Sequence, residues 1–408
     1  MAAVVVPLVL TLLLLLLPSH SSSQDRETER RRAVLQVLQQ YSDQHGALVL
    51  RTETPPALCA RKFVVSSYYG VGCTSMGNRI GGVLSNLLYA VLVNRTFVLT
   101  DNEHVRQCRG HLLIKNTFVF KEEILPLLVR SGCPITEVVN FDTLPPCNYS
   151  NLPNQAISND AILNRVFFHA HRDYDPTLQE PSLRRVELLF GHPSAYDLAR
   201  FEPYGLLFRM LFEFSEDVHR AVNSTLSSIT QRNPTKISIH LRHQNPKSMD
   251  NPSLDVGLDT RATRVLSKVL RVLHVKGACV VLIATDRNAT LHRIEQVALK
   301  YGCAPYSINR HKFPHAPDQL AEHGHWPKGL VQLADLLLLT HGDHFIGTLE
   351  STYSVLIANL IVSRYFLTKE VSFEPHMRWI NESCTSRYFD HPAPVNNCFS
   401  GHMIKKLK

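Results

Sequence analysis

A histidine and an arginine at the end of one short apolar segment form a pair that could bind an anion. Residues 237–239 (Ile-Ser-Ile) run directly into His240, Leu241 and Arg242. The β-branched alternation predicts a strand, in which His240 and Arg242 lie on the same side. A guanidinium fork matches two phosphate oxygens, and the imidazole can donate to another phosphate oxygen or to a leaving oxygen. Arg242 could instead pair with a carboxylate in the core.

A second anion-binding pattern precedes the first long apolar helix. Gly77, Asn78 and Arg79 stand immediately before an apolar stripe, between residues 80 and 92, that repeats at helical spacing. Backbone N–H groups at a helix start bind anions, and glycine permits close approach of a ligand. An ordinary turn before a helix has the same pattern. The sequence is without the phosphate-loop motif G-x-x-x-x-G-K-S/T.

Polar residues also follow two later segments that are predicted to be strands. Asp286 ends a near-continuous apolar run, where a carboxylate can meet a base, a ribose or a cation, or can cap the next helix. Ser351, Thr352 and Ser354 begin a helix just after another short strand. Their hydroxyl and N–H groups would form an anion cradle beside the helix dipole, with an ordinary N-cap as the alternative.

Apolar periodicity predicts the elements that position these residues. In the first half the predicted elements are strands at 62–67 and 95–100 and helices at 80–92, 121–130 and 202–223. From residue 235 onward, strands and helices alternate at the spacing of a doubly wound parallel sheet. Asp335 lies within one of these apolar helices, as a site group or on a solvated face. The sequence therefore predicts two α/β halves, joined near residues 224–235, that share a ligand cleft.

Composition favours a small anionic ligand over a nucleic acid. The chain of 408 residues is 44% hydrophobic and 19% charged, with a formal net charge of +8. Part of the excess lies in residues 26–32 (RETERRR), and the other basic residues are spread out, without a long block interleaved with aromatic residues. A basic but merely soluble surface is equally compatible with the charge.

The N-terminus predicts entry into the secretory pathway, with the lumen of the endoplasmic reticulum or Golgi, or secretion, as the destination. Residues 4–18 form an apolar run, and small polar residues follow it, which is typical of a signal peptide cleaved near residues 19–24. The run is short for a bilayer span of about 20 residues, but no Lys or Arg precedes it, so an uncleaved anchor stays open. Five N-x-S/T sequons support N-glycosylation: Asn94, Asn148, Asn223, Asn288 and Asn381.

The nine cysteines indicate disulfides rather than a metal cluster. None of them forms a C-x-x-C pair. In an oxidising lumen we expect up to four disulfides and one spare thiol, with Cys384 and Cys398 as a plausible local pair or simply as buried thiols. The single D-x-D string, Asp173-Tyr174-Asp175, falls in the irregular middle of the chain and is expected to be a loop. A metal-binding role for this string is the alternative.

Four segments, which follow the right order along the chain, resemble the GDP-fucose-dependent fucosyltransferase superfamily. "HLR" (240–242) and "DHFIGTLESTYS" (343–354) resemble the GDP-fucose site of protein O-fucosyltransferases. "SMGNRIGGVLSNLLYAVLVNRTFVL" (75–99) and "LFEFSEDVHRAV" (211–222) are similar to stretches of the plant cell-wall α1,2-fucosyltransferases and their relatives, which include α1,6-fucosyltransferases. Many relatives carry a second arginine where this chain has His243, and residues 100–205 match no part of the pattern. Acceptor and linkage therefore stay open.

The resemblance implies an α/β, GT-B-like fold of two Rossmann-like domains facing a central cleft. It also implies inverting transfer of fucose from GDP-fucose to a glycan or protein hydroxyl, with no cofactor and no metal. Arg242 would hold the β-phosphate and assist departure of GDP, and His240 would lie near the pyrophosphate or ribose. Ser351 and Thr352 would hold phosphate oxygens, Asp335 would lie near guanine, and Asn78 would approach from the opposite half. The remaining donor-site residues would be Gly77, Arg79, Asp286 and Ser354.

The sequence pattern and the resemblance together divide the chain into parts with expected roles. The expected parts are a signal peptide or short anchor (1–23), a charged helical stem (24–56), an acceptor-side α/β domain (57–225), a nucleotide-sugar-binding domain (226–370) and a tail that packs back with one disulfide (371–408). Partners would be the nucleotide sugar and a glycan or glycoprotein acceptor, with membrane contact only through an uncleaved N-terminus. The catalytic base is open among Glu350, Asp250 and Asp255. The alternatives are use of another nucleotide sugar, or an inactive carbohydrate-binding glycoprotein.

Overall fold

The computed structural model describes the central parts of both predicted halves. The described residues are 23–66, 76–99, 111–133, 202–230, 234–242, 252–274, 278–308, 326–348, 351–368 and 376–380. Several predictions fall outside them, namely those on the apolar N-terminus, on Asp173 to Asp175, on Asn148, Asn381, Glu350 and Asp250, and on the Cys384–Cys398 pair.

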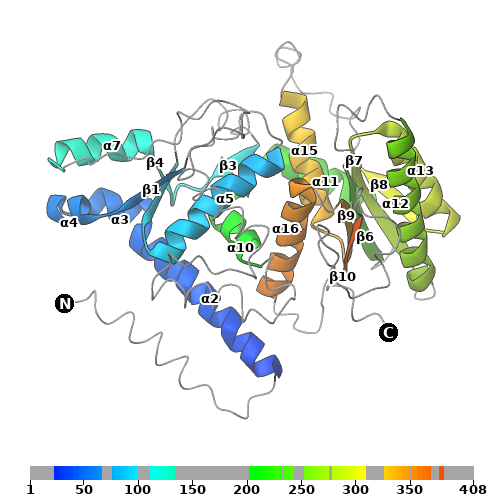
Figure 1. Ribbon diagram of the computed structural model, residues 1–408, viewed down its shortest axis with the longest axis horizontal. Coiled ribbons are helices and arrows are strands. Elements are labelled where there is room, and N and C mark those ends of the chain that lie inside the picture. The colour runs from blue at the N-terminus through cyan, green and yellow to red at the C-terminus, as the bar shows by residue number, and fades with distance from the viewer. Residues whose placement is uncertain are drawn as a thin grey trace.

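A parallel five-stranded sheet forms the C-terminal half, in the order β10-β9-β6-β7-β8. The chain passes from β6 outward to β7 and β8, then returns to the other side of β6 for β9 and β10, so its direction reverses between β6 and β9 (Figure 1). The strands are β6 (Thr235–Leu241), β7 (Cys279–Thr285), β8 (Ala304–Ser307), β9 (His344–Thr348) and β10 (His376–Ile380). The helices are α12 (Pro252–His274), α13 (Asn288–Lys300), α15 (Trp326–Leu339) and α16 (Thr352–Thr368).

The apolar pattern of this half explains its layers. Every residue of β7 is buried, as expected of a central strand covered on both faces. Side chains of α12 and α13, among them Leu266, Leu270 and Ile294, pack with Ile239 and Ile283 in one core. The amphipathic helices thus cover one face of the sheet and leave their polar sides to the solvent.

The N-terminal half contains a smaller parallel sheet, ordered β1-β2-β4. Its elements are β1 (Phe63–Ser66), α5 (Met76–Val93), β2 (Thr96–Leu99), β4 (Val119–Phe120) and α7 (Lys121–Arg130), preceded by α2 (Ser23–His45), α3 (Ala47–Thr52) and α4 (Pro55–Ala60). The segment predicted as a stem is helical, and α2 buries Val34, Val37, Leu38 and Tyr41 in the main core. Parallel sheets in both halves confirm the predicted α/β class and match the GT-B-like fold that the resemblance implies.

The single helix predicted at 202–223 is wrong. The structure has α10 (Glu202–Leu211), the strand β5 (Phe212–Phe214) and then α11 (Glu216–Ser227). The break arises because β5 pairs antiparallel with β3 (Leu112–Ile114). Ser215 then starts a new helix, since its hydroxyl accepts a hydrogen bond from the Val218 N–H.

Helix α16 joins the two halves. It packs against α5 and α10 of the N-terminal half and against β9 and α15 of its own half (Figure 1). Leu356, Ile357, Leu360 and Ile361 are all buried, and they belong to one core that includes residues of both halves. A helix that is apolar on all sides is expected at such a position.

Two disulfides lie within the described residues, Cys59–Cys133 and Cys279–Cys303. The first ties α4 to the residues after α7, and the second ties the start of β7 to the residue before β8. Such bonds persist in oxidising compartments, which fits the predicted secretory lumen. In the described part of the chain, no helix is long and apolar enough to span a bilayer.

The contact between α10 and α16 leaves no space for a side chain at Gly205. A methyl group there would come within 2.0 Å of the Asn359 carbonyl oxygen, a backbone atom that the helix holds in place. We expect Gly205→Ala to lower the free energy of unfolding by about 3 kcal/mol or more. Urea unfolding followed by circular dichroism measures this change.

Gly329→Ala is the matched control, because a methyl group at Gly329 in α15 would meet no atom within 4 Å. It should raise the free energy of unfolding by about 0.5–1 kcal/mol through helix propensity. Equal effects of the two substitutions would show that the α10–α16 contact tolerates a wider separation.

Candidate functional site

Five of the residues predicted to act on a ligand gather at one edge of the C-terminal sheet: His240, Arg242, Asp286, Ser351 and Ser354. β6, β7 and β9 are adjacent and parallel, so their carboxyl ends meet at this edge. α13 begins after β7 and α16 after β9, which brings two helix N-termini to the same place. The chain reverses direction between β6 and β9, and in open α/β sheets such a switch point is where ligands bind.

A chain of hydrogen bonds fixes His240 at this edge. Its Nδ1 lies 2.6 Å from the Ser354 hydroxyl oxygen, which also accepts a hydrogen bond of 3.2 Å from the Thr348 N–H. The Thr348 hydroxyl donates to the His240 carbonyl and accepts from the Arg242 N–H at 3.0 Å. These bonds hold the end of β6 against β9 and the first turn of α16.

This arrangement determines how His240 can act. Because the Ser354 oxygen accepts from Thr348, its own proton is available to His240 Nδ1, and the neutral ring then carries its proton on Nε2. Burial lowers the pKa of His240 to about 3, with Asp286 acting to raise the pKa and Arg242 to lower it further. His240 Nε2 makes no hydrogen bond within the described residues. The ring is therefore an uncharged, positioned donor.

Arg242 forms an ion pair with Asp286 at the rim of the site. The Nη1 atom of Arg242 lies 3.0 Å from the Asp286 Oδ2, with 45% of the Arg242 and 27% of the Asp286 side chain exposed. The alternative that Arg242 pairs with a carboxylate is thus realised, but at the solvent-accessible edge and not in the core. An exposed pair contributes about 0–1 kcal/mol, so it orients the guanidinium without preventing the binding of an anion.

The first turn of α16 lies next to His240. The Ser351 hydroxyl accepts from the Ser354 N–H at 3.4 Å, so the N-cap alternative is realised for Ser351. The Tyr353 ring lies beside the His240 ring in a tilted contact, with ring centroids 4.8 Å apart, and its hydroxyl donates to the Gln332 carbonyl of α15. The first N–H groups of a helix have no intrahelical partner and attract anions.

The other predicted donor-site residues that the structure describes lie on α15 and α5. Asp335 is buried in α15, one turn beyond Gln332. Asp286 precedes Arg287, the N-cap residue of α13, which makes no side-chain capping bond. Gly77 is buried in the first turn of α5, a helix that packs against α16. The side chains of Asn78, Arg79, Thr352 and Asp255 lie outside the described residues.

Sequence reasoning missed Thr348 and His341. Thr348 joins β6 to β9, and its only sequence signal is its place at the end of a short strand. His341 lies in the turn before β9, at the opposite edge of the sheet. Burial lowers its pKa to about 4, and the nearby cations Arg364, Lys236 and Arg209, with His219, lower it further.

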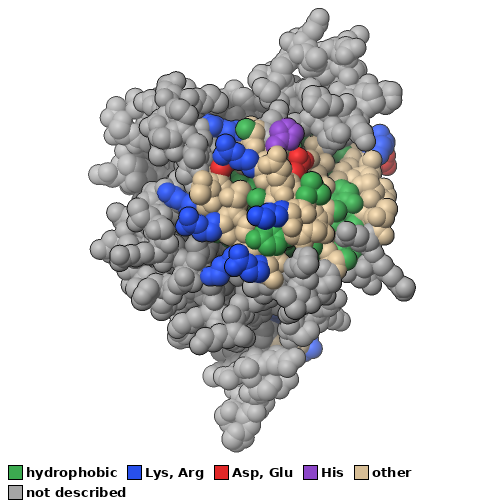
Figure 2. All heavy atoms as spheres, turned by 90° about the vertical axis from the view of Figure 1, so that its right-hand side faces the viewer, with side chains coloured by type: hydrophobic (Ala, Val, Ile, Leu, Met, Phe, Trp, Pro, Cys, Tyr) green, Lys and Arg blue, Asp and Glu red, His purple; other side chains and the backbone are tan. Residues whose placement is uncertain are grey.

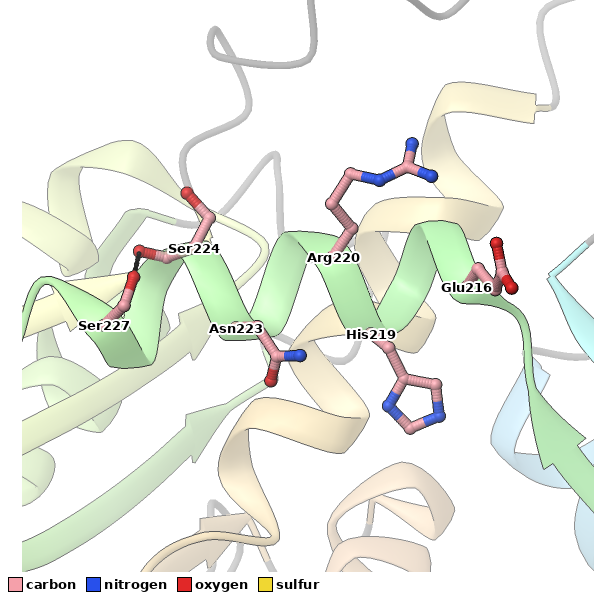
Figure 3. Close-up of a pocket in the computed structure, with 6 residues that line it drawn as sticks. All are labelled: Glu216, His219, Arg220, Asn223, Ser224 and Ser227. Atoms are coloured by element: carbon pink, nitrogen blue, oxygen red, sulfur yellow. Dashed lines mark hydrogen bonds between the residues drawn. The ribbon is translucent and has the colours of Figure 1, made fainter.

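A separate hollow of about 560 Å³ lies along α11 and contains none of the residues that converge at the carboxyl edge (Figure 3). Its lining is Glu216, His219, Arg220, Asn223, Ser224 and Ser227. Asn223 is exposed there, and Asn94 is exposed in the turn after α5, so both sequons leave room for a glycan. Glycosylation stays a prediction, as it does at Asn288, where α13 begins.

Among the residues that the structure describes, no group of three or more His, Cys, Asp or Glu side chains is placed to hold a metal ion. The edge instead offers a guanidinium, a neutral imidazole N–H and a helix N-terminus, all groups that bind anions.

No protein-family model and no curated protein matches the sequence. Solved structures with a similar fold include fucosyltransferases. The α1,6-fucosyltransferase NodZ from Bradyrhizobium, soaked with GDP-fucose, is 14% identical, with 74% of this chain and 92% of that chain covered and a TM-score of 0.42.

Two more fucosyltransferase structures show a likeness of the same order. Arabidopsis thaliana FUT1 in complex with GDP is 13% identical to this chain. The match covers 84% of this chain and 78% of that chain, with a TM-score of 0.48. POFUT1 in complex with GDP-fucose is 13% identical to this chain. The match covers 80% of this chain and 98% of that chain, with a TM-score of 0.43. At these identities the likeness concerns the fold alone.

Proposed function

We propose that this chain is a glycosyltransferase that moves fucose from GDP-fucose to a hydroxyl of a glycan or glycoprotein. The observation that carries the proposal is the convergence of Arg242, the neutral His240 ring and the N-terminus of α16 at the switch point of the sheet. The donor is inferred from the resemblance of residues 240–242 and 343–354 to the GDP-fucose site of protein O-fucosyltransferases.

In the proposed reaction, the bond between the anomeric carbon of fucose and the β-phosphate oxygen breaks. GDP leaves with increased negative charge, which the Arg242 guanidinium and the first N–H groups of α16 stabilise. His240 Nε2–H donates to a diphosphate or ribose oxygen. These groups take the place of a divalent cation, so transfer proceeds without a metal.

The acceptor hydroxyl attacks the anomeric carbon from the face opposite to the departing GDP, which inverts the configuration. Its proton passes to a base, for which Glu350, Asp250 and Asp255 are the candidates. Residues 226–370 would bind the nucleotide sugar, residues 57–225 would form the acceptor side, and residues 371–408 would pack back onto them. The reaction would take place in the lumen of the endoplasmic reticulum or Golgi.

GDP binding provides the first test. GDP at 100 to 1,000 times its dissociation constant should raise the free energy of unfolding by about 3–4 kcal/mol, which appears as a higher melting temperature in a thermal shift assay. UDP at the same concentration is the control for non-specific diphosphate binding. A protein that only binds carbohydrate would show no stabilisation by GDP.

An assay of donor hydrolysis then separates the enzyme hypotheses. The proposal expects GDP release from GDP-fucose to exceed release from GDP-mannose. Preferential hydrolysis of GDP-mannose would show that the donor of this enzyme carries a sugar other than fucose. A screen of glycan and glycoprotein acceptors with labelled GDP-fucose would then define the acceptor and the linkage.

A further inference from the structure

The solvent-facing sides of α12 and α13 carry an excess of cations that take no part in the contacts of the candidate site. Figure 2 shows this side of the molecule, with Lys and Arg side chains spread over it and fewer acidic ones among them. Residues 259–271 and 288–300 together contain six Lys or Arg against two Asp or Glu. We name the six the basic face: Arg261, Arg264, Lys268, Arg271, Arg293 and Lys300.

Four of these cations form a line along α12. Arg261, Arg264, Lys268 and Arg271 are spaced by three, four and three residues, which places them on one side of the helix. Arg264, Lys268 and Arg271 are exposed, while Ala262, Val265 and Leu266 of the same helix are buried against the sheet. The line extends over about 15 Å at 1.5 Å per residue.

Helix α13 lies beside α12 and adds Arg293 and Lys300 to the basic face. Asp259 of α12, itself buried, accepts hydrogen bonds from Thr290 and Arg293 of α13 at 2.8 and 3.0 Å, which holds the two helices together. At the other end, Arg271 donates a hydrogen bond to Tyr301, just after α13, and this bond is the main reason that the pKa of Tyr301 is lowered. The second acidic residue, Glu295, is engaged by His292 at 3.2 Å.

The length and spacing of the basic face fit a linear polyanion better than a small anion. Helix positions three or four residues apart are about 5–6 Å from each other, which is less than the Debye length of about 8 Å at physiological salt, so the potentials of neighbouring cations add. One phosphate group would engage one end of the line only. A chain with charges repeated along its length would engage all four cations.

The compartment decides which polyanion is available. The Cys279–Cys303 disulfide joins the start of β7 to the residue before β8, in the core that α12 and α13 cover, and indicates an oxidising environment. The anionic lipids that attract basic helices belong to the cytoplasmic leaflet. In a secretory lumen, acidic polysaccharides are the linear polyanions that remain. We propose that the basic face binds a sulfated polysaccharide chain, a property that does not depend on the transfer of fucose.

The test uses the full-length protein and immobilised heparin as the sulfated probe. The triple variant Arg264→Gln, Lys268→Gln, Arg271→Gln should bind at least about tenfold more weakly at 0.15 M salt. The slope of log K against log salt should fall by up to about one for each contact removed, following counterion release. The control Arg51→Gln, Arg130→Gln, Arg220→Gln has the same change in charge at exposed positions on other helices, and it should bind within about twofold of the wild type.

A footprint on the unmodified protein makes the test independent of how the variants fold. Heparin should protect Lys268 from acylation and leave exposed Lys62 reactive, as read by mass spectrometry. Equal weakening in both triple variants, absence of heparin binding, or no protection of Lys268 would overturn the proposal. So would tighter binding to phosphatidylserine vesicles than to heparin, because the face would then be a membrane surface. Unsulfated hyaluronate, expected to bind more weakly, distinguishes sulfate from carboxylate recognition.

Discussion

Replacement of Arg242 by alanine is expected to lower GDP-fucose turnover by about 10²- to 10³-fold, the usual effect of removing one donor to a developing negative charge. Arg242 is the cation that the proposed site places nearest to the departing diphosphate. Nearly half of its side chain is exposed, and its ion pair with Asp286 adds little stability, so the variant should fold normally. Steady-state kinetics with GDP-fucose, together with a melting curve, measure both properties.

Arg220→Ala is the matched control for this experiment. Arg220 is also an exposed arginine in an ion pair, with Asp217 at 3.0 Å, but it lies on α11. The control should keep the wild-type activity. Arg242→Lys should recover part of the activity at most, because an ammonium group lacks the bidentate fork. Wild-type turnover in Arg242→Ala would exclude the proposed role and, with it, the assignment of the site.

Acid is expected to destabilise the fold below about pH 6.5, through the buried His240 and the partly buried His341. The folded-state pKa of His240 is about 3 and that of His341 about 4. Both values lie below the unfolded value of about 6.5, so the unfolded chain takes up protons first as the pH falls. The stability present above pH 6.5 is therefore lost as the pH falls toward these values. Each histidine contributes about 2 kcal/mol of the loss between pH 7 and pH 5.

Urea unfolding at pH 7 and at pH 5 measures this loss. His240→Asn should reduce the difference between the two pH values by about 2 kcal/mol, whatever its effect on stability at pH 7. The control His292→Asn removes an α13 histidine whose side chain is 73% exposed, and it should retain the wild-type difference. If His240→Asn kept the full difference, the ring would be accessible to protons in the folded state.

The second half of the fold was predictable because its sequence pattern is local and strong. The apolar run of β7 and the helical stripes of α12 and α13 each identify their own element, and their alternation gives a parallel sheet. The α10–β5–α11 segment was not predictable in this way. β5 owes its strand to pairing with β3, a partner remote in sequence, and tertiary pairing overrode the helical pattern of Phe212 to Phe214.

The candidate site was predictable in position but not in its internal contacts. Strand alternation and parallel topology place His240, Arg242, Asp286 and Ser354 at one edge. No sequence pattern shows that Thr348 connects them, since that connection depends on the register of β9 beside β6. The same register makes Ser354 the partner of His240, and it leaves Ser351 as a helix cap.

The burial of α16 also limits how the protein can open and close around a substrate. A rigid rotation of one half away from the other would have to strip Leu356, Leu360 and their neighbours from one of their two sets of packing partners. Exposing each such side chain costs about 1.5–3 kcal/mol, which makes a wide swing of the halves unfavourable. In the proposed reaction, the substrates would then have to enter through small displacements at the rim of the site, because α16 holds the two halves together.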